Sequence, residues 1–186
     1  MPIEILQVVP TEARHPEIGR WLWALAEVRN RTLATVEGCD QQALDWTGAD
    51  GRENSIGSLL YHIAAVEMYW VFLDVLAQDL PGDVKELLPL PGFEDNRMTR
   101  VPGVSLWEHV ERLHATRNIA NTVFAEMDVD DWRRVSPPVD KTDEYEVSPE
   151  WAVFHLIEHE AGHTAQMSSL KARWRRRSGS TSEEQR

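Results

Sequence analysis

WAVFHLIEHEAGHTAQ, residues 151–166, contains three histidines at intervals of four residues, His155, His159 and His163. On an α-helix this spacing places the three side chains in one slowly drifting stripe. Neighbouring histidines lie one turn apart and can bind a single metal ion, but His155 and His163 are about 12 Å apart along the axis. A metal ion bound here therefore needs a further ligand from elsewhere in the chain.

The rest of the sequence predicts an all-α protein. Apolar residues recur at steps of three and four in long segments that begin at recognisable helix starts: Pro16, the N-cap Ser55, the capping box of Ser105 and Glu108, and Ser148 before Pro149. The expected helices cover about residues 16–37, 56–78, 106–127 and 149–174. Because we find no internal repeat and no strong strand pattern, the sequence predicts a four-helix bundle.

Two irregular connections separate the later helices. Residues 79–104 are rich in proline and glycine and exceed the roughly 2–8 residues that usually join antiparallel helices. A long crossover of this kind predicts that the second and third helices are parallel, in an up-down-down-up order. Residues 128–147 either form a solvated connection or fold over one end of the bundle.

Length and composition favour a single soluble domain. We expect one domain over residues 1–177, followed by a disordered polar tail over 178–186. The net charge of −12 argues against nucleic acid as a partner, and the single cysteine excludes an intramolecular disulfide. We recognise neither a signal peptide nor an apolar run long enough for a membrane span, so we expect no membrane partner and a cytoplasmic location.

The best candidate for the missing ligand is His62. It lies on the apolar stripe of the second helix, between Leu59 and Val66, where a lone histidine is otherwise a hydrogen-bonded core residue. The other histidines, His15, His109 and His114, lie off the apolar stripes, and we interpret them as surface or capping residues.

Two charged residues each have two interpretations. Glu160 directly follows His159, which gives a literal His-Glu-x-x-His match without the surrounding context of a zinc protease. It is either a catalytic general base or a hydrogen-bond acceptor for a ligating histidine. Arg117 interrupts the stripe of the third helix, either as a side chain reaching solvent from the core edge or as a cation for an anionic group.

The two histidine segments resemble the DinB-like superfamily. SIGSLLYHIAAVE, residues 55–67, followed about 90 residues later by the segment quoted first, is similar to this superfamily of metal-binding four-helix bundles, which includes bacillithiol- and mycothiol-dependent S-transferases. The resemblance implies that His62, His159 and His163 bind one divalent metal ion. From the last ligand onward, relatives read His-Arg-Gly-Gln, whereas this chain reads HTAQ and retains Gln166 but not the arginine. The resemblance places Gln166 and His155 beside the ligands.

These residues lead to two hypotheses about function. A metal ion at three histidines with an open coordination position suits an enzyme acting on a small molecule, either by thiol S-transfer with a low-molecular-weight thiol or by hydrolysis. Zinc is the expected metal, with nickel and iron as alternatives. The rival hypothesis is a non-catalytic metal-binding or scaffold bundle related to stress. Relatives often form homodimers, and the eight tryptophans leave room for an exposed aromatic contact surface.

Overall fold

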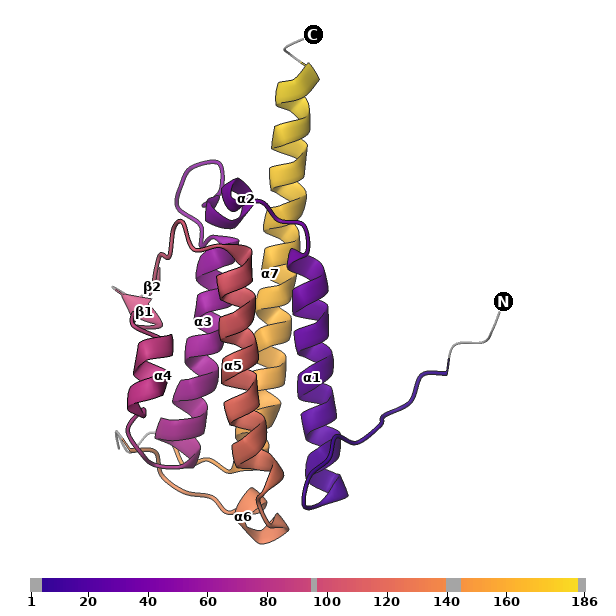
Figure 1. Ribbon diagram of the computed structural model, residues 1–186, viewed down its shortest axis with the longest axis vertical. Helices are drawn as coiled ribbons and strands as arrows, with labels where there is room; N and C mark the ends of the chain where they lie inside the picture. Colours follow the sequence, from indigo (N-terminus) through magenta and orange to yellow (C-terminus); the bar gives the residue numbers. More distant parts are fainter. Residues whose placement is uncertain (1–4, 95–96, 140–144, 184–186) are drawn as a thin grey trace.

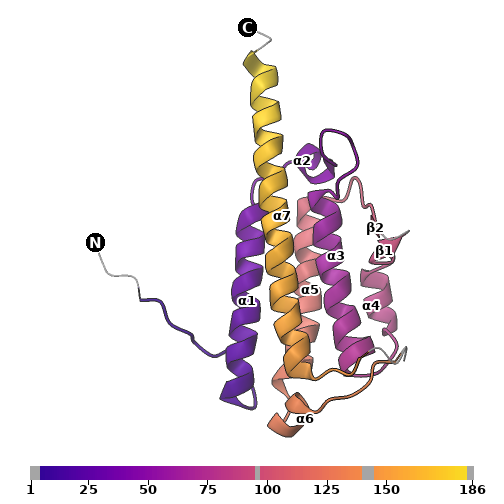
Figure 2. The ribbon, with the colours of Figure 1, turned by 180° about the vertical axis from the view of Figure 1, so that it is seen from behind.

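The computed structural model describes residues 5–94, 97–139 and 145–183, and these are mostly helical, which confirms the prediction of an all-α protein. Four long helical segments lie side by side (Figures 1 and 2). These are α1 (Pro16–Val36), α3 (Ile56–Tyr69) with its continuation η1 (Trp70–Val75), α5 (Leu106–Ala125) and α7 (Pro149–Glu183). In Figure 1, α1 and α7 run upward, whereas α3 and α5 run downward.

Short elements occupy the connections between the long helices. They are α2 (Gln41–Asp45), α4 (Gly82–Leu87), α6 (Val129–Arg133) and a hairpin of β1 (Phe93–Glu94) and β2 (Arg97–Met98). The hairpin is absent from the sequence prediction because strands of two residues are too short to show an alternating pattern. It lies in the long crossover, which leads from the lower end of α3 back to the upper start of α5 (Figure 1).

The predicted helix starts are confirmed where local capping determines them. The Ser55 hydroxyl accepts a hydrogen bond from the Ser58 backbone amide, and both halves of the Ser105–Glu108 capping box are formed. The first helix ends at Val36, one residue earlier than expected and two residues before Gly38, whose φ of 71° suits a residue without a side chain.

Two helix ends differ from the expectation. The second helix does not continue as a regular α-helix to residue 78, because it changes to a π-helical turn at Trp70. The last helix extends from Pro149 to Glu183 instead of ending near Trp174, and its upper part projects beyond the other helices (Figure 1). Residues 178–183 are therefore helical here, and residues 184–186 of the expected tail lie outside the described part of the chain.

Two tyrosines of α3 fix the crossover against the bundle. The Tyr61 hydroxyl donates to the Leu90 carbonyl at 2.6 Å and accepts from the Leu90 amide at 2.8 Å. The Tyr69 hydroxyl accepts from the Gly92 amide at 3.1 Å, and a Cβ atom at Gly92 would lie only 3.2 Å from the Tyr69 ring. Because the Gly92 backbone lies so close to the Tyr69 ring, the neighbouring residue Phe93 is held in a defined position.

A buried charge network connects all four long helices. Arg29 of α1, Glu67 of α3, Arg117 of α5 and Glu160 of α7 are each at most 6% exposed. Arg29 donates to both glutamates, at 2.7 Å to Glu160 and 3.2 Å to Glu67, and Arg117 also donates to both. Two positive and two negative charges therefore balance in the core, as buried charges require.

Glu67 and Arg29 are held in their ionised states by the opposite charges of the network. Burial acts to raise the pKa of Glu67, but Arg117 and Arg29 outweigh it and lower that pKa. Burial acts to lower the pKa of Arg29, and the two carboxylates outweigh this effect as well. Thr116 adds a hydrogen bond of 2.8 Å to Glu67. The four charges stabilise one another only while all four helices keep their relative positions.

One segment, Ile56–Val75, is long and apolar enough by composition to span a membrane, which the sequence analysis did not recognise. In the structure 83% of its apolar window is buried within the protein. Burial of this segment in the protein core therefore explains its hydrophobicity.

We expect the variant Arg117→Met to be about 3–5 kcal/mol less stable than the wild type, because it leaves Glu67 and Glu160 with one buried guanidinium instead of two. Urea unfolding followed by circular dichroism measures this loss. The matched control is Arg31→Met on the exposed surface of α1, which should change the free energy of unfolding by no more than about 0.5 kcal/mol. Equal stabilities of the two variants would contradict a structural role for the network.

Candidate metal centre

Three histidines from two helices meet at the seam between α3 and α7. The Nε2 atom of His159 lies 3.0 Å from Nε2 of His62 and 3.0 Å from Nε2 of His163. One nitrogen from each of the three rings falls within 4.8 Å of the other two. His62 is 2% exposed and His163 is 9% exposed, so the cluster lies just beneath the protein surface.

The spacing of these nitrogens suits a divalent metal ion. Bonds of about 2.0–2.1 Å to a tetrahedral zinc ion place neighbouring nitrogens about 3.3 Å apart, close to the two separations of 3.0 Å around His159. Three imidazoles provide three of four tetrahedral positions. Within the described residues no fourth histidine, cysteine or carboxylate joins the cluster, which leaves a position open for a small molecule.

The three rings are kept neutral, the state in which imidazole binds a metal ion. Burial and the neighbouring histidines lower the pKa of His159 to about 3. Burial and His163 lower the pKa of His62 to about 4, against a weaker opposite effect of the Gly92 carbonyl. Burial also lowers the pKa of His163. The cluster therefore presents free nitrogen lone pairs at neutral pH.

Groups around the cluster orient the rings. The Nδ1 atom of His163 lies 3.2 Å from the Gln166 side-chain oxygen, so Gln166 is beside the cluster, where the resemblance placed it. Phe93 packs edge-to-face on His62, with ring centroids 4.6 Å apart. The buried Nδ1 atom of His62 has no hydrogen-bond partner of good geometry within the described residues. Gln166 and Phe93 therefore form the wall of the site on the side that faces the hairpin.

His155 lies outside the cluster of three. Its Nδ1 atom is 3.2 Å from a Glu158 carboxylate oxygen, and its ring stacks parallel to Trp151 at a centroid distance of 5.3 Å. The ring of Trp70, at the start of η1, is 4.8 Å away, and that of His159 is 5.7 Å away. An aromatic group of Trp70, Trp151 and His155 thus borders the site on the side opposite Gln166.

Glu160, the candidate general base of the sequence analysis, lies within the buried charge network. Its two carboxylate oxygens accept hydrogen bonds from Arg29 and Arg117, and its side chain is 2% exposed. The buried ion pairs favour a structural role, in which Glu160 fixes the rotation of α7 and hence the direction of His159 and His163.

Both interpretations of Arg117 were wrong, because its side chain neither reaches solvent nor lines a pocket for an anion; it pairs with Glu67 and Glu160. Arg29 and Glu67 were missed as network residues altogether. Arg29 gave a usable signal, since it falls on the apolar stripe of the first helix, where an unpaired charge is costly. What the sequence does not show is which charges on separate helices meet.

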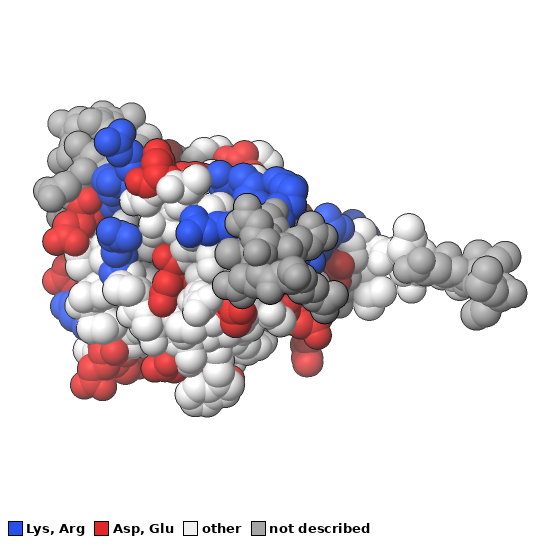
Figure 3. Space-filling model, turned by 90° about the horizontal axis from the view of Figure 1, so that it is seen from above, with Lys and Arg blue, Asp and Glu red and all other residues white. Residues whose placement is uncertain are grey.

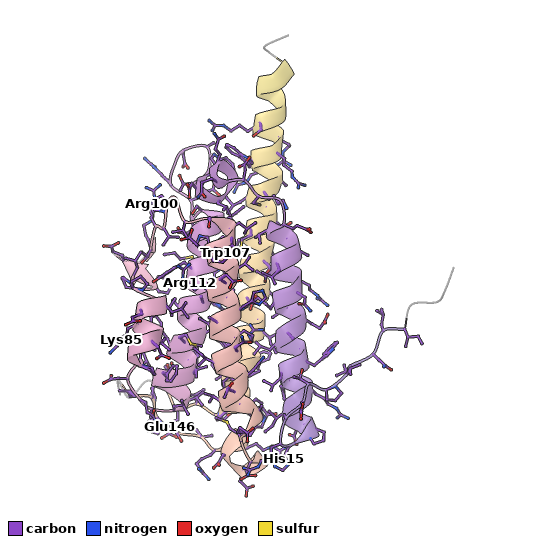
Figure 4. All side chains as sticks on the ribbon, in the orientation of Figure 1. His15, Lys85, Arg100, Trp107, Arg112 and Glu146 are labelled. Atoms are coloured by element: carbon purple, nitrogen blue, oxygen red, sulfur yellow. The ribbon has the colours of Figure 1, made fainter. Side chains whose placement is uncertain are left out.

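The interpretation of His109 as a surface or capping residue was also wrong. It is 1% exposed, and its Nε2 atom lies against Gly57, 3.2 Å from the position of a Cβ atom there. Burial, followed by the charge of Arg112, lowers its pKa to about 4. His114 is exposed, as expected, and His15 lies at the lower end of the molecule, 3.3 Å from Asp128 (Figure 4).

A groove of about 580 Å³ adjoins the cluster. Its lining residues come from the loop before α3, from α3 itself, from the hairpin and from α7: Arg52, Glu53, Asn54, Leu59, Phe93, Arg97, Met98, Gln166, Ser169, Leu170 and Arg173. Trp70 and Trp151, which border the other side of the site, do not line this groove. Phe93 and Gln166 belong to both the groove and the wall of the histidine site, so the two lie next to each other.

Because the pKa of His109 is lowered, the stability it contributes is present above about pH 6.5 and is lost as the pH falls towards 4. For the metal-free protein we expect His109→Gln to reduce the fall in unfolding free energy between pH 6.5 and 4 by up to about 3 kcal/mol. The control His114→Gln, at an exposed position of the same helix, should titrate like the wild type. Parallel stability curves for all three proteins would show that His109 is not held neutral.

Comparison with known proteins agrees with this geometry. A family model described as mycothiol-S-transferase matches residues 22–175, which include all three clustered histidines, Gln166 and the four charges of the network. No curated protein matches the sequence. The chain therefore belongs to the mycothiol-S-transferase family, within the DinB-like superfamily.

Proposed function

We propose that the protein is a metal-dependent thiol S-transferase and that its reaction takes place at the cluster of His62, His159 and His163. The observation that carries the proposal is the convergence of three neutral imidazole nitrogens within 4.8 Å in a chain of this family. Zinc suits the ligand set best, with nickel and iron as alternatives. A divalent metal ion bound here would favour the thiolate form of a coordinated thiol, which is the reactive form.

The protein's own cysteine does not compete for the role of nucleophile. Cys39 is buried near the end of α1, and burial raises the pKa of its thiol. The reacting sulfur must then come from a low-molecular-weight thiol. Transfer forms a bond from this sulfur to an electrophilic carbon, breaks the bond from that carbon to its leaving group, and releases the thiol proton to solvent.

The chain's own side chains support a small-molecule reaction in two ways. The groove lies next to the cluster, with Phe93 and Gln166 between them, and is large enough for much of a small substrate. On the other side, Trp70 and Trp151 present partly exposed rings next to His155. Such rings suit the apolar part of an electrophilic substrate. The π-helical turn at Trp70 is a feature often found at functional sites.

We further propose a four-helix bundle of the up-down-down-up type, a single domain over residues 1–177, a cytoplasmic location and a homodimer. Support for the homodimer comes from exposed aromatic side chains away from the site, Trp107 at 69% (Figure 4) and Phe154 at 44%. Analytical ultracentrifugation measures the oligomeric state directly.

Metal content and thiol transfer test the proposal together. We expect the wild type to bind about one equivalent of zinc, nickel or iron, and His159→Ala to bind none, because it removes the nitrogen central to the cluster. The matched control is His155→Ala, one turn earlier on the same helix and outside the cluster, which should retain the metal. Elemental analysis of untagged protein gives the stoichiometry.

The metal-loaded wild type should then transfer mycothiol or another low-molecular-weight thiol to an alkylating electrophile, and His159→Ala should be more than about 100-fold slower. Thioether formation is measured by chromatography. Metal binding without transfer of any thiol would support the rival hypothesis of a non-catalytic metal-binding protein. Turnover of an ester or amide in the absence of a thiol would instead support hydrolysis.

A further inference from the structure

The groove beside the histidine cluster is unusually basic for this protein. The chain as a whole has a net charge of −12, yet the groove is lined by three arginines and one carboxylate, Glu53. An adjoining hollow shares Arg97 with the groove and adds one residue of each charge, Arg100 and Glu94. Arg100 lies at the outer edge of the crossover (Figure 4). Other Lys and Arg side chains are also exposed on the upper end of the molecule (Figure 3). A positive groove on an acidic protein concentrates anions at that point.

The three arginines are not equivalent. Arg173 forms two hydrogen bonds with the Glu53 carboxylate and lies over the Trp46 ring, 5.4 Å from its centroid. Its charge is therefore already matched, and it serves mainly to hold Glu53 and the loop before α3 in place. The positive charge that remains in the groove belongs to Arg52 and Arg97.

Arg52 and Arg97 have no carboxylate partner within the described residues. Arg97 donates one hydrogen bond to the backbone carbonyl of Arg52, which fixes the two residues next to each other and leaves further N–H donors of both guanidinium groups unused. Arginine donors arranged in pairs suit the planar oxygens of a carboxylate or the oxygens of a phosphate. Asn54 and Ser169, which also line the groove, can add neutral hydrogen bonds.

The groove also lies beside the proposed reaction centre. Gln166 contacts His163 and lines the groove, and Phe93 packs on His62 and lines it too. Arg52 and Arg97 therefore line the same groove as two residues that contact the histidine cluster.

We propose that Arg52 and Arg97 bind a carboxylate or phosphate group of a substrate that reacts at the histidine cluster. The proposal rests on the proposed function for the identity of the reaction, but anion binding itself does not depend on it. The anionic group has two alternative sources: a low-molecular-weight thiol other than mycothiol, which has neither a carboxylate nor a phosphate, or the electrophile.

Binding of inorganic phosphate to the metal-free protein tests the site without any reaction. Removal of the metal prevents phosphate from binding a metal ion instead. We expect saturable binding by calorimetry at low ionic strength, and about tenfold weaker binding to Arg97→Gln and to Arg52→Gln. The control Arg31→Gln, on α1 and outside the groove, should bind phosphate like the wild type. Absence of binding to the wild type, or equal binding by all variants, would overturn the proposal.

Steady-state kinetics of the metal-loaded enzyme then identify the source of the anionic group. In Arg97→Gln, a higher KM for the thiol with an unchanged KM for the electrophile assigns the anion to the thiol, and the reverse pattern assigns it to the electrophile. A variant with both KM values unchanged would contradict the proposal. A wild type that binds phosphate at this groove but transfers no thiol would disprove the proposed reaction and leave the anion site intact.

Discussion

The buried charges of Arg29, Glu67, Arg117 and Glu160 form the interaction on which the rest of the structure depends. Each long helix contributes one charge, and each glutamate accepts from both arginines. Rotating or sliding any one helix would leave an uncompensated charge in the core, which is far more costly than a change in apolar packing. The network thereby fixes how the four helices lie relative to one another, including the two helices that carry the histidines.

The site follows from this constraint. Glu160 stands between His159 and His163 in sequence, and Glu67 follows His62 by five residues, so the network sets the rotation of α7 and α3 that brings three imidazole nitrogens together. Burial in the seam keeps the rings neutral and ready to bind a metal ion. The crossover, held to α3 by Tyr61 and Tyr69, then places Phe93 and the basic groove beside them.

The sequence predicts those features that depend on neighbours along the chain. The capping box at Ser105, the start at Ser55 and the burial of His62 all follow from local spacing and were confirmed. The partners of Arg117 and Glu160 could not be predicted, because they lie on other helices more than 40 residues away. The groove is even more difficult to predict from the sequence, since Arg52, Arg97 and Arg173 come from three separate segments and share no spacing pattern.

The central claim is that the three histidines bind one metal ion in an arrangement that the charge network fixes. Anomalous X-ray diffraction from crystals of the zinc-loaded protein, recorded on both sides of the zinc absorption edge, tests it most directly. We expect one strong anomalous peak about 2.0–2.2 Å from the Nε2 atoms of His62, His159 and His163. A peak at other residues, or a zinc ion whose coordination is closed by a fourth protein side chain, would contradict the open three-histidine centre described above.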